Sequence, residues 1–355
     1  MSRSVVAAMT AYTLELREAE IKLNQNESPF DFPKEIKEQV LARMADRPWN
    51  RYPDFESIAL RTAIAKASGL DADNILVGNG SNELLAATIG AFVGPGTPVI
   101  FPRPTFALYE KLVTIAGGLP IPIDFEPDSG LLPLEEMLAA IARYESAVVI
   151  ACSPNNPTGS VLPDRGLESL LESGAMVLLD QAYADFQSGG QAILPVRTDK
   201  IDGPRTDKIV CLPRNLVRFR TFSKAWGLAA LRVGWLTSTV ENCREIRKVK
   251  LPYSLNVISE AIAVAALGSP SIRAANVTAI LAERERVLAA MRGIPRITVF
   301  PTQANFIAFR AERPLFEALC TRGILIRQVA GGCLRVSIGT PEQNDAFLAA
   351  LKEIA

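Results

Sequence analysis

Lys224 has surroundings that suit a reactive amine, because it stands among hydroxyl, small and apolar residues in the stretch TFSKAWGLAALR, residues 221–232. A strongly hydrated ammonium group is costly to place among apolar side chains, and such surroundings lower its proton affinity. The free amine that results can attack a carbonyl carbon and form a Schiff base. Four arginines crowd the same region and would strengthen this effect: Arg214, Arg218, Arg220 and Arg232. The alternative is a strand-end lysine whose ammonium group reaches solvent.

The composition excludes several kinds of catalytic site. The chain has 355 residues with 38 basic and 38 acidic side chains, and it contains no histidine. The lack of histidine excludes a Ser-His-Asp triad and histidine metal sites, and we expect no metal. A proton shuttle near neutral pH must then use lysine, a carboxylate, tyrosine or cysteine. Zero net charge argues against nucleic acid or a membrane surface as a partner.

The predicted compartment is the cytoplasm. None of the five cysteines forms a CxxC pair, which is typical of a protein from a reducing compartment. No apolar run approaches the length of a membrane span. The first 25 residues lack the basic start and apolar centre of a signal peptide.

A glycine-rich turn, GNGSNE at residues 78–83, precedes an apolar helical pattern that starts at Leu84. Such a turn presents free backbone N–H groups and the positive end of the helix dipole, which together suit a phosphate group. Ser81 and Asn82 are the candidate phosphate ligands. The alternative is an ordinary turn in which one of them caps the helix.

Two further motifs follow predicted strands. Phe106, in the segment PTFALY at 104–109, could stack on a planar ligand, or it could belong to the core. Asn156, in SPNNPTG at 153–159, offers an amide held between two prolines, although Asn-Pro and Thr-Gly also favour plain tight turns. Ligand sites in open α/β sheets lie beyond the carboxyl ends of strands, where both motifs fall.

Asp180 ends the next predicted strand, and Tyr183 follows three residues later. A carboxylate in this place can partner a protonated pyridine nitrogen, as the electron sink of pyridoxal phosphate requires. Tyr183 could reach the same ring. The alternative for Asp180 is a helix N-cap.

The elements that must position these residues follow from the hydrophobic pattern. Between about residues 75 and 240, short apolar runs alternate with helical patterns, which favours an α/β domain with a mostly parallel sheet. We expect strands at 98–101, 147–152, 175–180, 208–212 and 231–237. We expect helices at 33–45, 56–68, 257–267 and 273–291, a surface loop at 188–206, and a smaller α+β domain from the mixed elements after residue 296.

In this order and combination the motifs resemble the pyridoxal-phosphate aminotransferases of the aspartate aminotransferase fold, over nearly the whole chain. The motifs SPNNPTG and SKA are highly specific for that superfamily. Further matching segments are LNQNESP at 23–29, NRYPD at 50–54 and LRVSIGT at 334–340. The segment at 50–54 and the Ile-Arg-Gln of residues 326–328 point to the histidinol-phosphate branch.

The resemblance implies a role for each matching residue around the cofactor. Lys224 would carry the Schiff base and shuttle the substrate proton, while Asp180 would keep the pyridine nitrogen protonated. Asn156 and Tyr183 would hydrogen-bond the phenolic oxygen, and Phe106 would stack on the ring. The implied phosphate ligands are Ser81, Asn82, Thr221, Ser223 and Arg232.

The resemblance also implies how substrates and subunits are arranged. Arg335 would bind the α-carboxylate of glutamate and the phosphate of histidinol phosphate, with Arg327 as a second anion ligand and Asn156 nearby; alternatively, Arg335 makes a surface ion pair. Tyr52 would reach the cofactor phosphate of a neighbouring subunit, so the active unit would be a homodimer. The implied fold has a large domain with a seven-stranded, mostly parallel sheet and a smaller α+β domain. We expect an arm over 1–30, a large cofactor-binding domain over 46–245, and a small domain from 31–45 and 246–355.

The predicted function is transamination between histidinol phosphate or its keto form, imidazole acetol phosphate, and 2-oxoglutarate or glutamate, in histidine biosynthesis. Three positions depart from the pattern of the branch: Phe106 where tyrosine is common, Gln181 where glutamate is usual, and Ala230 where glycine is frequent. None removes a catalytic group. They leave open an aminotransferase for aromatic or other amino acids. A second alternative is a decarboxylase resembling threonine-phosphate decarboxylase, which shares this fold and a phosphate-bearing substrate. A non-enzymatic pyridoxal-binding regulator has no basic DNA-binding segment to support it.

Overall fold

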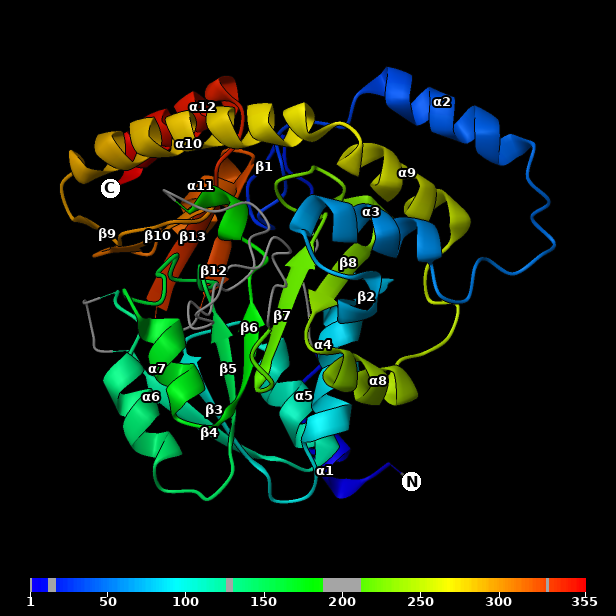
Figure 1. Cartoon of the computed structure of the whole chain (residues 1–355). Coiled ribbons are helices and arrows are strands. Elements are labelled where there is room, and N and C mark those ends of the chain that lie inside the picture. The colour runs from blue at the N-terminus through cyan, green and yellow to red at the C-terminus, as the bar shows by residue number, and fades with distance from the viewer. Residues whose placement is uncertain (1, 12–16, 126–129, 188–211, 330–331) are drawn as a thin grey trace, which may run out of the picture.

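Seven strands form the central sheet, in the order β2-β8-β7-β6-β5-β3-β4 (Figure 1). The computed structural model describes residues 2–11, 17–125, 130–187, 212–329 and 332–355. The strands are β2 Ile75–Asn79, β3 Pro98–Arg103, β4 Leu119–Asp124, β5 Val148–Cys152, β6 Met176–Asp180, β7 Leu216–Thr221 and β8 Val233–Thr237. Of these, β8 pairs antiparallel with both neighbours and the other pairs are parallel. The expected mostly parallel seven-stranded sheet is confirmed.

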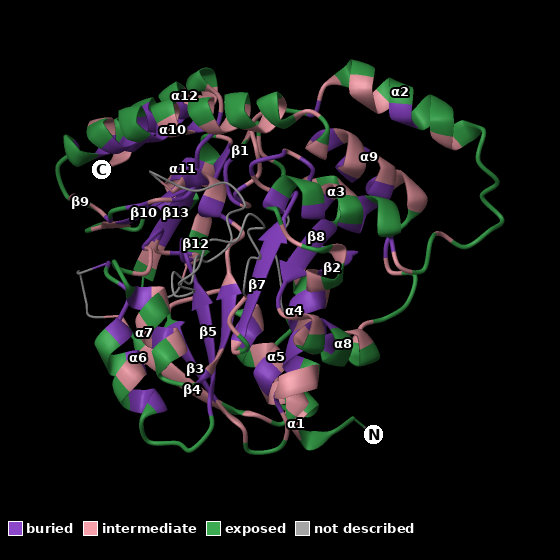
Figure 2. Ribbon diagram, viewed as in Figure 1, coloured by how far each residue is buried: buried purple, intermediate pink, exposed green. Residues whose placement is uncertain are grey.

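The strands of this sheet are apolar on both faces because helices cover both faces. Alternate residues of β5 illustrate this: Val148 and Ile150 pack in one core cluster, and Val149 and Ala151 in another. The first face carries α4 Ser81–Phe92, α5 Leu108–Ala116 and α8 Val240–Val249. The opposite face carries α3 Ile58–Ser68, α6 Leu134–Ile141, α7 Gly166–Glu172 and α9 Val257–Leu267. Figure 2 shows the central strands of the sheet, such as β5 and β7, as buried between these helices, whereas the edge strand β4 is only partly buried.

A second, four-stranded antiparallel sheet lies beside the first, in the order β12-β13-β10-β9. Its strands are β9 Ile297–Val299, β10 Phe306–Ala311, β12 Arg327–Val329 and β13 Cys333–Ser337. The helices that share its core are α10 Pro270–Arg292, α11 Phe316–Thr321 and α12 Pro341–Ile354. These elements form the smaller α+β unit that the sequence predicts.

The N-terminal part of the chain runs along both units. It contains α1 Ser4–Ala7, and β1 Ile21–Lys22, which pairs in parallel with β11 Ile324–Leu325. The next helix, α2 Lys34–Ala45, lies at the outer edge of the molecule with little buried surface (Figure 2). The short helices η1 Ala72–Asn74, η2 Ala184–Phe186 and η3 Ala229–Leu231 complete the described elements.

Most predicted elements are present, and the exception is the strand expected at 208–212. Residues 208–211 lie outside the described residues, and Leu212 is not in a strand. The strand of this region, β7, begins four residues later, after a turn in which Leu216 N–H donates to the Pro213 carbonyl at 3.2 Å. Arg218 and Arg220 interrupt its apolar pattern, yet both are buried, which is why the pattern did not reveal it. The loop expected at 188–206 also lies outside the described residues.

Among the described residues no single helix has the length and apolarity needed to cross a bilayer. The pair α9 and α10 meets the criterion only jointly, and the two helices are bent by 79° at the break between them.

Candidate active site

The chemistry-bearing motifs meet because the carboxyl ends of parallel strands lie at one edge of a sheet. The register places Asp180 of β6 opposite Cys152 at the end of β5 and Phe219 near the end of β7. Since β8 runs the other way, its first residues lie at the same edge, with Val233 opposite Asn79. The loops that carry the predicted site residues therefore leave or enter the sheet together.

Lys224 lies at this edge, just beyond β7, and its Nζ donates to the Gln25 carbonyl at 2.9 Å. Nζ is also 5.7 Å from the centre of the Tyr183 ring. Burial lowers the pKa of Lys224 to about 7, and the positive charge of Arg335 contributes in the same direction. An amine with this pKa is about half deprotonated near pH 7, and its neutral form is a nucleophile.

Asp180 receives two hydrogen bonds at the end of β6. The Tyr109 hydroxyl donates to its Oδ2 at 2.7 Å, and the Ala182 N–H donates to its Oδ1 at 3.0 Å. Desolvation raises the pKa of the carboxyl, while these hydrogen bonds and the Lys224 charge oppose the rise. The N-cap of η2 is Tyr183, so Asp180 is not the cap of that helix.

Tyr183, Asn156 and Arg335 form a group beside Lys224 together with the N-terminal segment Asn24–Asn26. The Arg335 guanidinium donates through Nη1 to Asn156 Oδ1, and through Nη2 to the Asn24 carbonyl at 2.7 Å. The Tyr183 hydroxyl accepts from Asn26 Nδ2 at 3.0 Å, and burial raises its pKa to about 12. Arg335 is buried in this group, so it is not a surface ion pair.

A phosphate-sized cradle forms where the β2–α4 turn meets β8. Ser81 is the first residue of α4 and Asn82 the second, so their backbone N–H groups have no partner inside the helix. Ser223 Oγ accepts from Thr221 Oγ1 at 2.9 Å and from Arg232 Nη1 at 3.3 Å. The cradle therefore presents two helix N–H groups, two hydroxyls and one guanidinium to a ligand.

Glycines keep this cradle open. Gly80 has φ +79°, and a Cβ there would lie 2.5 Å from Arg232 Nη2. A Cβ at Gly234 of β8 would lie 2.3 Å from the Ser81 nitrogen. Both positions therefore bring backbone or guanidinium groups closer than any side chain would allow.

The remaining predicted site residues are Phe106, Arg327 and Tyr52. Phe106 is half-buried and packs edge-on against Tyr109, with ring centres 5.6 Å apart. Arg327 is directly opposite Arg335 in the β12–β13 register, which places both side chains on one face of the small sheet. Tyr52 is 79% exposed and stacks on Tyr253 at 4.7 Å, in the segment between α2 and α3.

The residues present fit pyridoxal phosphate. The open cradle suits a phosphate, the Asp180 carboxylate suits a protonated ring nitrogen, and the Lys224 amine suits an aldehyde. The Tyr183 hydroxyl and the Asn156 amide are groups that can hydrogen-bond a phenolic oxygen. No cluster of three or more potential metal ligands occurs in the described part of the chain.

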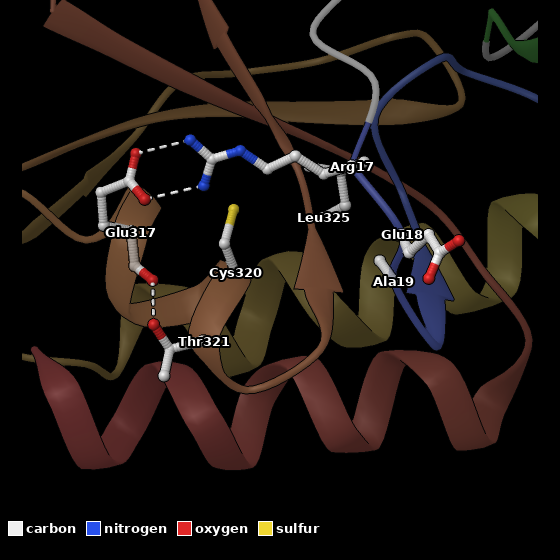
Figure 3. A pocket seen from close by; sticks show the side chains of 7 residues that line it. All are labelled: Arg17, Glu18, Ala19, Glu317, Cys320, Thr321 and Leu325. Carbon is white, nitrogen blue, oxygen red and sulfur yellow. Dashed lines mark hydrogen bonds and ion pairs between the residues drawn. The ribbon is translucent and has the colours of Figure 1, made fainter.

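Two cavities lie outside this group. One, of about 220 Å³, lies where the N-terminal arm meets α11. Arg17 lines it and makes a bidentate ion pair with Glu317, beside Cys320 (Figure 3). The other, of about 340 Å³, lies between the ends of β3 and β4 and the small sheet, and Pro157 and Thr158 line it next to Asn156.

Comparison with known proteins identifies the family of this chain. A model of the class I and II aminotransferases matches residues 18–351. The chain belongs to this family. As a class I and II aminotransferase it is a pyridoxal-phosphate-dependent transaminase, and the predicted cofactor and enzyme class are confirmed.

Similar aminotransferases include several from bacteria. The chain is 37% identical over 347 residues to the histidinol-phosphate aminotransferase of Chlorobium luteolum, covering 94% of this chain and 91% of that one. It is 34% identical over 348 residues to that of Chlorobaculum tepidum, covering 95% of each. The crystal structure of the Sinorhizobium meliloti histidinol-phosphate aminotransferase with pyridoxal 5'-phosphate matches with a TM-score of 0.86 at 25% identity, over 99% of this chain and 96% of that chain.

Sequence reasoning missed several partners of the aminotransferase site. Tyr109 lies within the quoted PTFALY motif, but only the fold brings its hydroxyl to Asp180. The segment Asn24–Asn26 supplies contacts to Arg335, Lys224 and Tyr183 in turn. It lies in the LNQNESP motif, which supported the resemblance but suggested no role for these residues.

Proposed function

We propose that this aminotransferase interconverts L-histidinol phosphate and imidazole acetol phosphate, with glutamate and 2-oxoglutarate as the second pair, in histidine biosynthesis. The observation that carries the proposal is the pairing of a Lys224 amine of lowered pKa with the buried Arg335 guanidinium, both held by carbonyls of the N-terminal segment. The names of relatives at 34–37% identity support the choice of substrate. Glutamate would deliver its amino group in the first half-reaction, and the keto acceptor would take it up in the second.

Bound pyridoxal phosphate supplies an aldehyde and an electron-withdrawing ring to this chemistry. We propose that Lys224 holds the aldehyde carbon and later moves the proton at the substrate Cα. Asp180 would keep the ring nitrogen protonated, and Phe106 would pack on the ring face. Asn156 and Tyr183 would donate to the phenolic oxygen. The proposed phosphate ligands are Ser81, Asn82, Thr221, Ser223 and Arg232.

Arg335 is the proposed ligand of the glutamate α-carboxylate and of the phosphate of histidinol phosphate, with Asn156 beside it. Its fork of donors suits either anion. Arg327 is the proposed second anion ligand, because it shares a sheet face with Arg335. We expect Arg335→Ala to weaken both glutamate and histidinol phosphate; weakening of only one would contradict a shared anion site.

We propose a homodimer with the active sites at its interface. Large exposed apolar side chains gather around the α2–α3 segment and the start of α9, namely Trp49, Tyr52, Phe55, Ile58, Leu251 and Tyr253. Such a surface is typical of protein–protein contact. In a dimer, Tyr52 would reach the cofactor phosphate of the partner subunit.

The proposed domain division follows the two sheets: an arm at 1–30, a large domain at 46–245, and a small domain from 31–45 and 246–355. Support comes from the central sheet, which spans residues 75–237, and the small sheet, which spans 297–337. We also propose a cytoplasmic location; the described cysteines are all free thiols, as a reducing compartment requires.

The absorbance spectrum of the purified protein tests the proposed function. We expect a visible band that glutamate bleaches, and that histidinol phosphate bleaches at far lower concentration. Bleaching by phenylalanine but not by histidinol phosphate would indicate an aromatic aminotransferase. Release of carbon dioxide without a glutamate half-reaction would indicate a decarboxylase. A protein with no visible band after addition of pyridoxal phosphate would refute the proposal.

A further inference from the structure

Asn26 is a fully buried residue whose side chain is hydrogen-bonded to Tyr183 of the site. Its side chain is 0% exposed, and its Nδ2 donates to the Tyr183 hydroxyl oxygen at 3.0 Å. Its backbone has φ +54°, a left-handed conformation that asparagine and aspartate adopt more readily than other residues with a side chain. The carbonyl of Asn26 accepts from Asn305 Nδ2 at 3.1 Å, so the residue is held from several sides.

The orientation of the Asn26 amide is determined by Ser337. The Asn26 backbone N–H must donate, and it donates to Ser337 Oγ at 2.8 Å. The Ser337 hydroxyl then has its own proton free, and Asn26 Oδ1 accepts it at 3.1 Å. With Oδ1 used in this way, the NH₂ group of the amide is the side that faces Tyr183.

This arrangement decides where the Tyr183 proton points. An amide NH₂ can only donate, so the Tyr183 oxygen accepts from it and must place its own O–H elsewhere. Among the described residues no other protein hydrogen bond to the Tyr183 hydroxyl occurs. Lys224, 5.7 Å from the Tyr183 ring centre, marks the side on which the cofactor would lie.

We propose that Asn26 is a positioning residue, oriented by Ser337, that directs the Tyr183 hydroxyl proton toward the phenolic oxygen of the cofactor. The hydrogen bonds run in one direction, from the Asn26 backbone through Ser337 and the Asn26 amide to Tyr183. This inference rests on the proposed function, because it concerns the same cofactor site. A hydrogen bond donated to the phenolic oxygen stabilises its negative charge, and the lysine nitrogen beside it then loses its proton at lower pH.

The variant Asn26→Asp tests the direction of the hydrogen bonds with almost no change of volume or backbone preference. A carboxylate only accepts, so Tyr183 would donate to it and withdraw its proton from the cofactor. We expect the pH midpoint of the visible absorbance change of the bound cofactor to rise by roughly 1 unit. The measurement is a spectroscopic pH titration of the loaded protein without substrate.

The background Tyr183→Phe separates this effect from the added negative charge. If Asn26 acts through the Tyr183 proton, Asn26→Asp shifts the midpoint much less in that background, because coupled residues are non-additive. An equal shift in both backgrounds would show a simple charge effect and overturn the proposal. Asn305→Ala is the matched control: it loosens the same segment but keeps the amide, and its midpoint should stay at the wild-type value.

Ser337→Ala gives a second test that adds no charge. Without the serine hydroxyl the Asn26 amide can turn, so we expect the pH midpoint to rise by a smaller amount than in Asn26→Asp. This variant therefore tests the proposal even if Asn26→Asp does not fold. An unmoved midpoint in both variants, with a normal wild-type band, overturns this inference alone. The absence of a visible band in the wild-type protein overturns the proposed function and this inference together.

Discussion

At the scale of single residues, Lys224 depends on charges from several parts of the chain. Burial, Arg335 and Arg232 lower its pKa, whereas Glu27 and Asp180 raise it, and the result is a pKa of about 7. The unfolded chain would hold the same proton up to the ordinary lysine value of 10.5. Between these values the unfolded state binds more protons, so the free energy of unfolding rises with pH over this window.

Replacing Lys224 by methionine should remove this dependence. We expect the cofactor-free Lys224→Met protein to melt at least about 2 °C above wild type at pH 7, because the buried ammonium is gone. The difference should shrink as the pH rises toward the ordinary lysine pKa of 10.5, because the unfolded lysine then begins to lose its proton as well. Thermal melts of both proteins across this pH range measure the difference in melting temperature. A difference independent of pH would contradict the low pKa assigned to Lys224. The same variant should have no transaminase activity.

The Tyr109 hydroxyl favours the ionised form of Asp180, whose desolvated place disfavours it. The hydrogen bond from Tyr109 lowers the pKa of the carboxyl, so Tyr109→Phe should raise it. We expect the acid limb of the kcat/KM profile to move to higher pH by roughly 1 unit. The exposed Tyr144 offers a matched control, since Tyr144→Phe should leave the profile unchanged. An unshifted acid limb in Tyr109→Phe would mean that the backbone N–H of Ala182 is sufficient.

At the scale of elements, the β2–α4 turn and the start of β8 build the phosphate cradle between them. Gly80 allows the turn its positive φ and leaves room for the Arg232 guanidinium, and Gly234 lets β8 approach the first residue of α4. Neither element could form the cradle alone, because the N–H groups come from one and the guanidinium from the other.

Gly80→Ala should therefore weaken phosphate binding selectively. The new Cβ would displace Arg232 Nη2 from its place beside the helix N-terminus. We expect the affinity for pyridoxal phosphate to fall about tenfold or more, and that for pyridoxal, which lacks the phosphate, to change far less. Gly69→Ala is the control, because Gly69 has a similar φ of +68° but open space around it. Equal losses for both ligands would point to general damage to the fold.

At the scale of the whole molecule, the site joins distant parts of the chain. Arg335 comes from the small sheet, Lys224 from the central sheet, and the carbonyls of Asn24 and Gln25 that hold them come from the N-terminal segment. Tyr52 is exposed, and its ring stacks on Tyr253 rather than on a residue of the proposed site. A partner subunit is where its proposed role can be fulfilled.

Mixed dimers test this arrangement directly. Lys224→Ala and Tyr52→Ala proteins should each be nearly inactive. If Tyr52 serves the partner's site, unfolding and refolding an equal mixture should restore about a quarter of wild-type activity, since half the dimers are mixed and each has one intact site. Activity that stays at the average of the two parents would place Tyr52 in the site of its own subunit, or show that the protein does not exchange subunits.

Much of the site could be predicted because its residues lie in short motifs at strand ends. Asp180, Asn156 and Lys224 follow strands, and their chemistry is visible from type and spacing alone. The strand β7 was not predicted, because Arg218 and Arg220 are residues typical of a surface, and only the fold shows that they are 8% and 6% exposed. Whether a charged side chain is buried depends on what packs over it, which the local pattern does not contain.

The sequence by itself determined the alternation of strands and helices, the absence of histidine chemistry, and the order of cofactor-binding motifs along the chain. Those features are local, because they depend on residue type and on neighbours a few positions away. Only the tertiary structure decided that Tyr109 serves Asp180, that Arg327 shares a face with Arg335, and that Asn26 and Ser337 orient Tyr183. Contacts such as that between Asn26 and Ser337, 311 residues apart, arise from packing of the whole chain and leave no periodic signal along it.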